Sequence, residues 1–248
     1  MKCLSKVFKS LIIMIFITLT GCSNKNNYNF PILMYHSISD EIIGTSESNN
    51  LNVADFEQQM KYIHDNNIKT IFLDELDNYK ESNEEIVVLT FDDGFKNFYT
   101  TVYPIIKKYN IKVNLFMITD YTAERYINYL SETQLIELDS SGLVRIGSHT
   151  KTHPRLAKMQ YSDAYAELKE SKEYLEGILN KPVTTLSYPY GNYDSKIIEA
   201  ASKSGYEYAV LVSGGMENMS YNKLKLKRIN VPRGIKLEEY ISYIENAN

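Results

Sequence analysis

The sequence predicts an α/β fold in which parallel strands and outer helices form a β/α barrel, complete or incomplete. Segments of strand length and apolar composition alternate with amphipathic helical segments along most of the chain, which is the pattern of parallel strands with helices outside. Polar side chains also follow several of these strands directly. A barrel collects active-site residues from the ends of many strands, whereas an open sheet collects them near one switch point, so this distribution favours the barrel.

Eight segments have the character of strands, namely residues 31–35, 70–73, 86–91, 113–118, 143–147, 184–188, 208–212 and 224–229. Helices are indicated by apolar residues at helical spacing, which are Phe56, Met60 and Ile63 in one segment and Tyr165, Leu168, Leu175 and Leu179 in another. Helix starts are expected at Ser131 (in a capping box with Gln134), Ser162 and Asp194, and a helix end at Gly205.

Length and composition are those of one large globular domain. The chain has 248 residues, of which 44% are hydrophobic and 23% charged, and this is enough apolar material for one core. No internal repeat or second linker divides residues 30–248, so we expect a single domain there. The net charge is -4 and no long basic run is present, so nucleic acid is not an expected partner.

The N-terminal residues have the character of an export signal. Lysines precede a short apolar run at residues 11–19, which is too short for a transmembrane helix. Next comes Leu-Thr-Gly-Cys, ending at Cys22, which resembles the bacterial lipobox, where cleavage precedes the cysteine and its thiol is acylated. We expect a signal peptide at residues 1–21, a lipidated Cys22 with a polar tether at residues 22–29, and attachment to the extracellular face of the bacterial cell membrane. A plain secretory signal with an incidental cysteine is the alternative.

Two neighbouring carboxylates follow the apolar strand at residues 86–91. Asp92, Asp93 and Gly94 could be a simple turn with glycine at positive φ. However, two acids that face one pocket repel each other and raise one pKa unless a cation lies near them. A divalent metal would resolve this conflict, with one aspartate as its ligand and the other free to act as a base.

Two histidines at ligand spacing lie just after residues 143–147. His149 and His153 can present both imidazoles to one side, on a helix or in a turn, and Pro154 favours a tight local structure. Two surface histidines are the alternative, although the chain has only 4 histidines. One aspartate and two histidines leave coordination positions open for water and substrate, as in a metal-dependent hydrolase.

Two further positions at strand ends could take part in chemistry. His36 ends the first strand segment, where a buried core histidine is the alternative. Tyr190 lies in a Tyr-Pro-Tyr-Gly segment that could be an ordinary turn, or could present the Tyr190 backbone N–H to a developing oxyanion. A phosphohydrolase built on the two aspartates is the weakest alternative, because no phosphate cradle or basic cluster accompanies them.

Taken together, these motifs resemble the polysaccharide deacetylases of carbohydrate esterase family four. The matching segments are Thr-Phe-Asp-Asp-Gly at residues 90–94, His-Thr-Lys-Thr-His at residues 149–153 and, less closely, Tyr-Pro-Tyr-Gly at residues 188–191. The resemblance runs from about Pro31 to the C-terminus, which is nearly all of the expected mature protein, and implies a distorted β/α barrel of about seven parallel strands in a single domain.

The resemblance also implies roles for individual residues. A divalent metal, usually zinc, would be held by Asp93, His149 and His153. Asp92 would be the catalytic base.

The chain departs from the family pattern at two points. The third motif usually begins with an arginine that orients the base, but Ser187 stands there, and Arg228 or Arg233 could replace the arginine. The late motifs that supply an acid histidine are absent, since the chain has no Trp and no histidine follows the second motif. The opening Pro-Ile-Leu-Met-Tyr-His at residues 31–36 is similar to that of the poly-β-1,6-N-acetylglucosamine deacetylases, in which the motif order is permuted and the first-strand histidine is the acid. This similarity implies His36 as the acid.

The expected activity is metal-dependent removal of N-acetyl groups from N-acetylglucosamine units of an extracellular polysaccharide. The first-strand histidine favours poly-β-1,6-N-acetylglucosamine, and peptidoglycan is the alternative substrate. A non-catalytic glycan-binding lipoprotein is a second alternative, against which the complete set of two aspartates and two histidines argues. The expected partners are therefore the polysaccharide and, through a lipid anchor, the membrane.

Overall fold

The computed structural model describes residues 29–80, 82, 84–122, 126–218 and 220–245. The expected signal peptide, Cys22 and all but the last residue of the expected tether lie outside the described residues. Asn29, which was expected to end the tether, already pairs with Asn218 in the first strand. Within the described part of the chain, no helix combines the length and the apolar character needed to cross a bilayer.

Short strands alternate with helices along the described residues. The strands are β1 (Asn29–Phe30), β2 (Ile32–Tyr35), β3 (Ser37–Ile38), β4 (Asn50–Leu51), β5 (Lys69–Thr70), β6 (Ile86–Phe91), β7 (Val113–Met117), β8 (Val144–Ser148), β9 (Thr185–Ser187), β10 (Tyr208–Val210), β11 (Glu217–Asn218) and β12 (Ile229–Asn230). The α-helices are α1 (Val53–Asp65), α2 (Tyr103–Tyr109), α3 (Glu132–Ser140), α4 (Tyr161–Leu179), α5 (Ser195–Lys203) and α6 (Leu237–Glu245). Shorter helical turns lie at Glu47–Asn49, Leu73–Tyr79, Phe98–Val102, Leu156–Lys158 and Pro189–Gly191.

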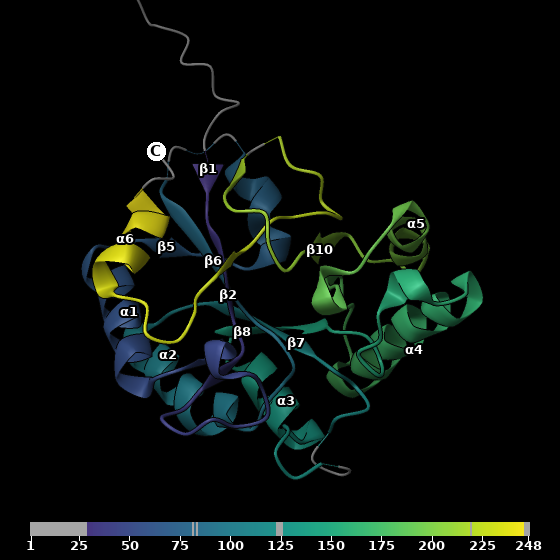
Figure 1. Ribbon diagram of the computed structural model, residues 1–248, viewed down its shortest axis with the longest axis horizontal. Coiled ribbons are helices and arrows are strands. Elements are labelled where there is room, and N and C mark those ends of the chain that lie inside the picture. Colours follow the sequence, from purple (N-terminus) through teal and green to yellow (C-terminus); the bar gives the residue numbers. More distant parts are fainter. Residues whose placement is uncertain (1–28, 81, 83, 123–125, 219, 246–248) are drawn as a thin grey trace, which may run out of the picture.

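The main sheet is parallel and curls on itself. Its strand order is β10-β9-β8-β7-β6-β2-β12, and β5 also pairs with β6. In Figure 1, β2 and β6 run steeply down the picture while β7 lies across it. The two ends of the sheet approach each other, because Leu226, shortly before β12, bridges to Val210 of β10. The sheet is a curled half-barrel, and the predicted distorted barrel of about seven parallel strands is confirmed.

Alternation along β6 decides which side chains face the inside of this barrel. Leu89 packs in the large cluster that contains the apolar residues of α1 and α3, whereas Ile86 and Val88 pack in a separate cluster with residues of β2, β7 and β10. Successive side chains of a strand point to opposite faces. The side chains of Thr90 and Asp92 therefore lie on the inner face of the barrel, like those of Ile86 and Val88.

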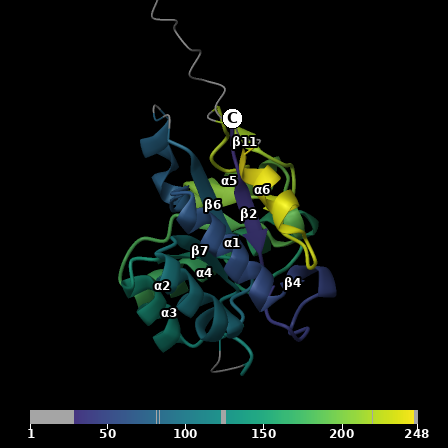
Figure 2. The ribbon, with the colours of Figure 1, turned by 90° about the vertical axis from the view of Figure 1, so that its left-hand side faces the viewer.

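Helices cover the outer face of the sheet (Figure 1 and Figure 2). α1 packs against α2 and α6, while α4 packs against α3 and α5. Phe56, Met60 and Ile63 of α1 are all buried, and so are Leu168 and Leu175 of α4. The helical spacing read from the sequence thus identified the core-facing stripe of both helices.

Several expected boundaries are confirmed at the level of single residues. Ser131 and Gln134 form the capping box that begins α3, and the Asp194 side chain accepts from the Ile197 N–H at the start of α5. Gly205 has a φ of 85° just after α5, which is the left-handed conformation that ends many helices.

Other boundaries differ from the expectation. The strand expected at residues 70–73 stops at Thr70, because the Leu73 N–H donates to the Asn114 side chain (2.9 Å) and a 3₁₀ turn begins there. The strand expected at residues 224–229 is regular only from Ile229, since the preceding residues turn aside to bridge to β10. Ser162 does not cap α4, which begins one residue earlier.

Candidate active site

The two aspartates lie at the carboxyl end of β6, where the chain turns away from the sheet. The Asp92 N–H still donates to Tyr35 O of β2 (3.0 Å), and Asp92 is 1% exposed. Asp93 and Gly94 both have positive φ, 76° and 84°, so the chain reverses directly after Asp92. A side chain at Gly94 would collide with the Met117 sulfur, so this turn requires glycine.

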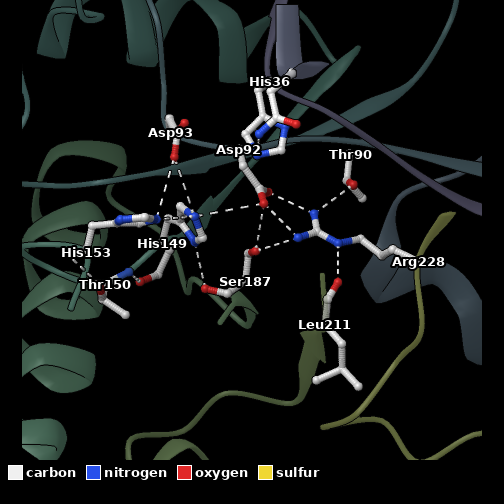
Figure 3. Close-up of polar contacts among 12 residues, drawn as sticks. His36, Thr90, Asp92, Asp93, His149, Thr150, His153, Ser187, Leu211 and Arg228 are labelled. Atoms are coloured by element: carbon white, nitrogen blue, oxygen red, sulfur yellow. Dashed lines mark hydrogen bonds and ion pairs between the residues drawn. The ribbon is translucent and has the colours of Figure 1, made fainter. Parts of the chain in front are cut away.

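A buried arginine from the far end of the chain pairs with Asp92 (Figure 3). Arg228 Nη1 donates to Asp92 Oδ1 (2.8 Å) and Nη2 donates to Oδ2 (2.6 Å), the bidentate geometry of strong guanidinium–carboxylate pairs. Arg228 also donates to the Thr90 hydroxyl (3.0 Å) and to Leu211 O (2.5 Å). Burial opposes the ionisation of Asp92, but Arg228 and then His149 hold the pKa of Asp92 well below its usual range.

Ser187 occupies the position where the deacetylase pattern has an arginine. Its hydroxyl donates to Asp92 Oδ2 (3.2 Å) and accepts from Arg228 Nη2 (2.9 Å). A small residue at this position leaves room for the Arg228 guanidinium, which enters from the segment before β12. Of the two arginines expected as substitutes, Arg228 lies beside Asp92, whereas Arg233 donates to backbone carbonyls such as Asn50 O (2.8 Å).

Asp93, His149 and His153 converge on one point (Figure 3). Asp93 Oδ1 lies 3.6 Å from His149 Nε2 and 3.8 Å from His153 Nε2, and the two Nε2 atoms are 3.1 Å apart. Donor atoms of the three residues lie within 4.8 Å of one another and form a candidate metal site. His149 Nδ1 contacts Ser187 O (2.8 Å). Because a carbonyl only accepts, Nδ1 carries the proton and the Nε2 lone pair is free for a metal.

A tight turn, rather than a helix, brings the two histidines together. Thr150 and His153 have left-handed backbone, with φ of 66° and 63°, which is uncommon for residues that carry a side chain. Glu167 of α4 holds this turn: its carboxylate accepts from the N–H groups of Lys151 (3.0 Å) and Thr152 (2.8 Å) and from the Thr152 hydroxyl (2.7 Å). Glu167 was not predicted from the sequence, because one acid on a helix carries no mark of the turn that it binds.

The charge states of the three residues suit a divalent cation. Burial, and then the nearby Asp92 carboxylate, raises the pKa of Asp93 to about 7. Burial lowers the pKa of His149 to about 3 and also lowers that of His153. Neutral imidazoles and a carboxylate whose charge needs a partner are the ligands that zinc takes, and three of them leave coordination positions open.

His36 follows β2 and lies near Asp92 (Figure 3). His36 Nε2 is 3.4 Å from the Asn49 amide nitrogen, while the buried Nδ1 has no hydrogen-bond partner among the described residues. Burial lowers the pKa of His36 to about 4, although the Asp92 charge opposes this shift. The imidazole is therefore neutral at neutral pH in the free protein.

Tyr190 lies beside His153, in the 3₁₀ turn Pro189–Gly191 that follows β9. Its ring centroid is 4.6 Å from that of His153, and the Arg155 guanidinium lies 4.1 Å from the Tyr190 ring centroid. The Gly191 N–H closes the turn on Tyr188 O (2.9 Å). These contacts hold Tyr190 at the rim of the site.

One pocket of about 650 Å³ gathers the residues that the sequence analysis singled out. Its lining includes His36, Asp92, Asp93, His149, His153 and Tyr190, that is, every predicted site residue except Cys22, which lies outside the described residues. Phe95, Tyr121 and Tyr129 also line this pocket. These aromatic residues were not predicted from the sequence, because they lie between strands and helices where no periodicity marks them. The volume is typical of ligand sites.

Comparison with known proteins identifies the family. The sequence model described as polysaccharide deacetylase matches residues 79–209. The YxkH protein of Bacillus subtilis is 33% identical over 222 residues, which are 87% of this chain and 76% of YxkH. The chain belongs to the polysaccharide deacetylase family.

Two further comparisons place this polysaccharide deacetylase among its relatives. The poly-β-1,6-N-acetyl-D-glucosamine N-deacetylase of Staphylococcus epidermidis is 29% identical over 204 residues, covering 76% of this chain and 71% of that enzyme. The crystal structure of a polysaccharide deacetylase from Bacillus cereus has a TM-score of 0.80 and 29% identity, covering 87% of this chain and 69% of the other. The deacetylase is thus an amide-hydrolysing enzyme with a candidate metal site of one aspartate and two histidines.

Proposed function

We propose that this deacetylase removes acetyl groups from N-acetylglucosamine units by metal-dependent hydrolysis. The observation that carries the proposal is the presence in one pocket of a three-residue candidate metal site and a separate carboxylate, Asp92, that Arg228 keeps ionised. Asp93, His149 and His153 would hold the ion, and zinc suits this ligand set.

Asp92 is the catalytic base in this proposal. When bound, a divalent metal lowers the pKa of water and polarises the acetamide carbonyl. Asp92 Oδ2 lies 3.9 Å from His149 Nε2, so the carboxylate would be within reach of a water held beside the three ligands. Asp92 accepts the proton of this water as the oxygen attacks the carbonyl carbon, and Arg228 keeps the carboxylate oriented.

His36 supplies the proton to the departing amine, which leaves poorly without one. Because burial keeps the His36 imidazole neutral in the free enzyme, His36 must gain a proton after substrate binds. The proton that Asp92 takes from water is the available source, and the unpartnered Nδ1 of His36 can take part in the transfer.

The Tyr190 backbone N–H stabilises the oxyanion that develops on the acetamide oxygen. The turn that carries Tyr190 is closed by its own hydrogen bond and packed against His153, which supports a fixed donor. A donor of this kind contributes about 3 kcal/mol to transition-state stabilisation.

The proposed substrate is poly-β-1,6-N-acetylglucosamine. Support comes from the 29% identity with the Staphylococcus epidermidis enzyme of that specificity and from the position of His36 at the end of β2. Peptidoglycan is the alternative substrate, and the experiment below compares acetate release from the two.

The proposal also includes attachment to the extracellular face of the membrane through a lipid on Cys22. The deacetylase domain would then comprise residues 30–248. β2 carries the chain from the first described residues toward His36, so Asn29 lies at the end of the barrel opposite the pocket. A tether at this end would present the pocket away from the membrane and toward the polymer. Replacing Cys22 with serine should release the enzyme from the membrane fraction.

Acetate release from defined oligomers tests the activity. We expect release from a β-1,6-linked N-acetylglucosamine pentamer to exceed that from peptidoglycan fragments, to stop on strong chelation and to return with zinc or cobalt. Asp92→Asn should retain the metal but lose activity by about 10²- to 10⁴-fold, whereas His149→Ala should lose both. Acetate release that continues after complete chelation would contradict the proposal.

A further inference from the structure

An aromatic cluster borders the pocket on the side of Asp93. Tyr121, Tyr126 and Tyr129, here called the tyrosine cluster, are in mutual ring contact, with centroids 5.0, 5.2 and 6.2 Å apart. Tyr121 and Tyr129 line the pocket. Tyr126 is 50% exposed, and the neighbouring Ile127 is 75% exposed. Large apolar side chains exposed at the rim of a pocket are typical of ligand-binding surfaces.

The tyrosine cluster is attached to both loops that carry the candidate metal ligands. The Leu130 N–H donates to Gly94 O (3.0 Å), which ties the segment after Tyr129 to the turn after the two aspartates. The Asp120 N–H donates to Lys151 O (2.9 Å), which ties the segment before Tyr121 to the turn between the two histidines. These bonds hold the backbone on either side of the tyrosine cluster against the two loops that carry the candidate metal ligands.

The chemistry of tyrosine suits a sugar ring. A pyranose presents C–H groups on its faces and hydroxyls around its edge, while tyrosine presents an apolar ring with a hydroxyl at its edge. The chain has 21 Tyr and no Trp, so tyrosine is the large amphipathic aromatic residue on which it can stack a sugar. The substrate is a polymer, so units on either side of the reacting one must lie along the rim of the pocket.

We propose that the tyrosine cluster is a subsite for the sugar unit next to the one that loses its acetyl group. The inference rests on the proposed function, because it takes the acetamide to lie at the candidate metal site. The enzyme then prefers oligomers long enough to reach the cluster over a single N-acetylglucosamine.

The test compares a β-1,6-linked N-acetylglucosamine pentamer with the monosaccharide. Tyr126→Ala should lower the ratio of kcat/KM on the pentamer to that on the monosaccharide by about threefold to tenfold, mainly through KM. Tyr126→Phe, which keeps the ring, should retain most of the ratio. Tyr161→Ala is the matched control, because Tyr161 is also exposed (37%) but lies on α4 outside the pocket lining.

Calorimetric binding of the same pentamer in the Asp92→Asn background separates this inference from the proposed function. We expect Tyr126→Ala to weaken this binding by about the same factor. Tyr126-dependent binding without acetate release by the unmodified enzyme would overturn the proposed activity and leave the tyrosine cluster as a glycan-binding surface only. Acetate release with an unchanged ratio and unchanged binding in Tyr126→Ala would overturn the subsite.

Discussion

A catalytic carboxylate that is buried needs a cation beside it, and the pair of Asp92 and Arg228 shows that this cation can come from different places in a chain. The deacetylase pattern takes its guanidinium from the start of the third motif, whereas here Ser187 stands there and Arg228 pairs with Asp92 across 136 positions. Two N–H donors placed against the two carboxylate oxygens keep the group ionised and fixed in orientation. The geometry, rather than the position of the arginine in the sequence, meets the requirement.

Replacing Arg228 with methionine should destabilise the enzyme strongly. The substitution keeps much of the side-chain volume but leaves the Asp92 carboxylate buried without a cation, which costs about 3 to 5 kcal/mol in free energy of unfolding. Urea denaturation measures the loss. The double variant Asp92→Asn with Arg228→Met should lose less than the sum of the two single variants, and a strictly additive result would contradict the coupling.

At the scale of elements, helix α4 determines the shape of the turn that holds two candidate metal ligands. Glu167 accepts three hydrogen bonds from Lys151 and Thr152, and these bonds stabilise a turn in which two non-glycine residues have positive φ. The spacing of His149 and His153 permits a shared metal, but the helix behind the turn makes their nitrogens converge.

Glu167→Ala should therefore weaken metal binding by about 10- to 100-fold, as loss of an orienting partner typically does. Zinc titration of the metal-free protein measures this change directly. Glu170→Ala is the matched control, because Glu170 lies on the same helix and pairs with Lys151 through exposed side chains. Equal zinc affinity in the two variants would show that Glu167 has no positioning role.

At the scale of the whole molecule, curling of the sheet buries the site, and this burial shifts the pKa values of its side chains. Residues after β2, β6, β8 and β9 meet at one end of the half-barrel, as in other β/α barrels. Burial there lowers the pKa of His36 to about 4 from the ordinary value of 6.5. Below pH 6.5 the unfolded chain binds a proton at His36 that the folded protein does not bind until about pH 4.

The contribution of His36 to the free energy of unfolding of the metal-free protein should therefore decrease by about 3 kcal/mol as pH falls from about 6.5 to about 4. His149, whose pKa burial lowers to about 3, acts in the same direction. Asp93, whose pKa burial raises to about 7, acts in the opposite direction, so the comparison of variants isolates the part that belongs to His36. His36→Gln should reduce the pH dependence, as measured by urea denaturation at several pH values with chelator present. Identical pH dependence in His36→Gln and the unmodified protein would contradict the burial of a neutral His36.

Prediction from the sequence succeeded where a local pattern has a local physical cause. The apolar run of β6 marks a strand buried on both faces, and its bounds were predicted as residues 86–91 and observed as Ile86–Phe91. The strand expected at residues 224–229 was wrong over most of its length, because its pairing with β10 and β2 depends on how the sheet curls.

The sequence by itself determined the α/β class, the family and the aspartates and histidines of the pocket, because strand periodicity, caps and the spacing of aspartates and histidines act over a few neighbouring residues. Only the tertiary structure decided that Arg228, and not Arg233, accompanies Asp92, that Glu167 shapes the histidine turn, and that tyrosines border the pocket. These contacts join residues far apart in the chain, and their energy depends on distance and burial rather than on sequence separation, so no local pattern records them.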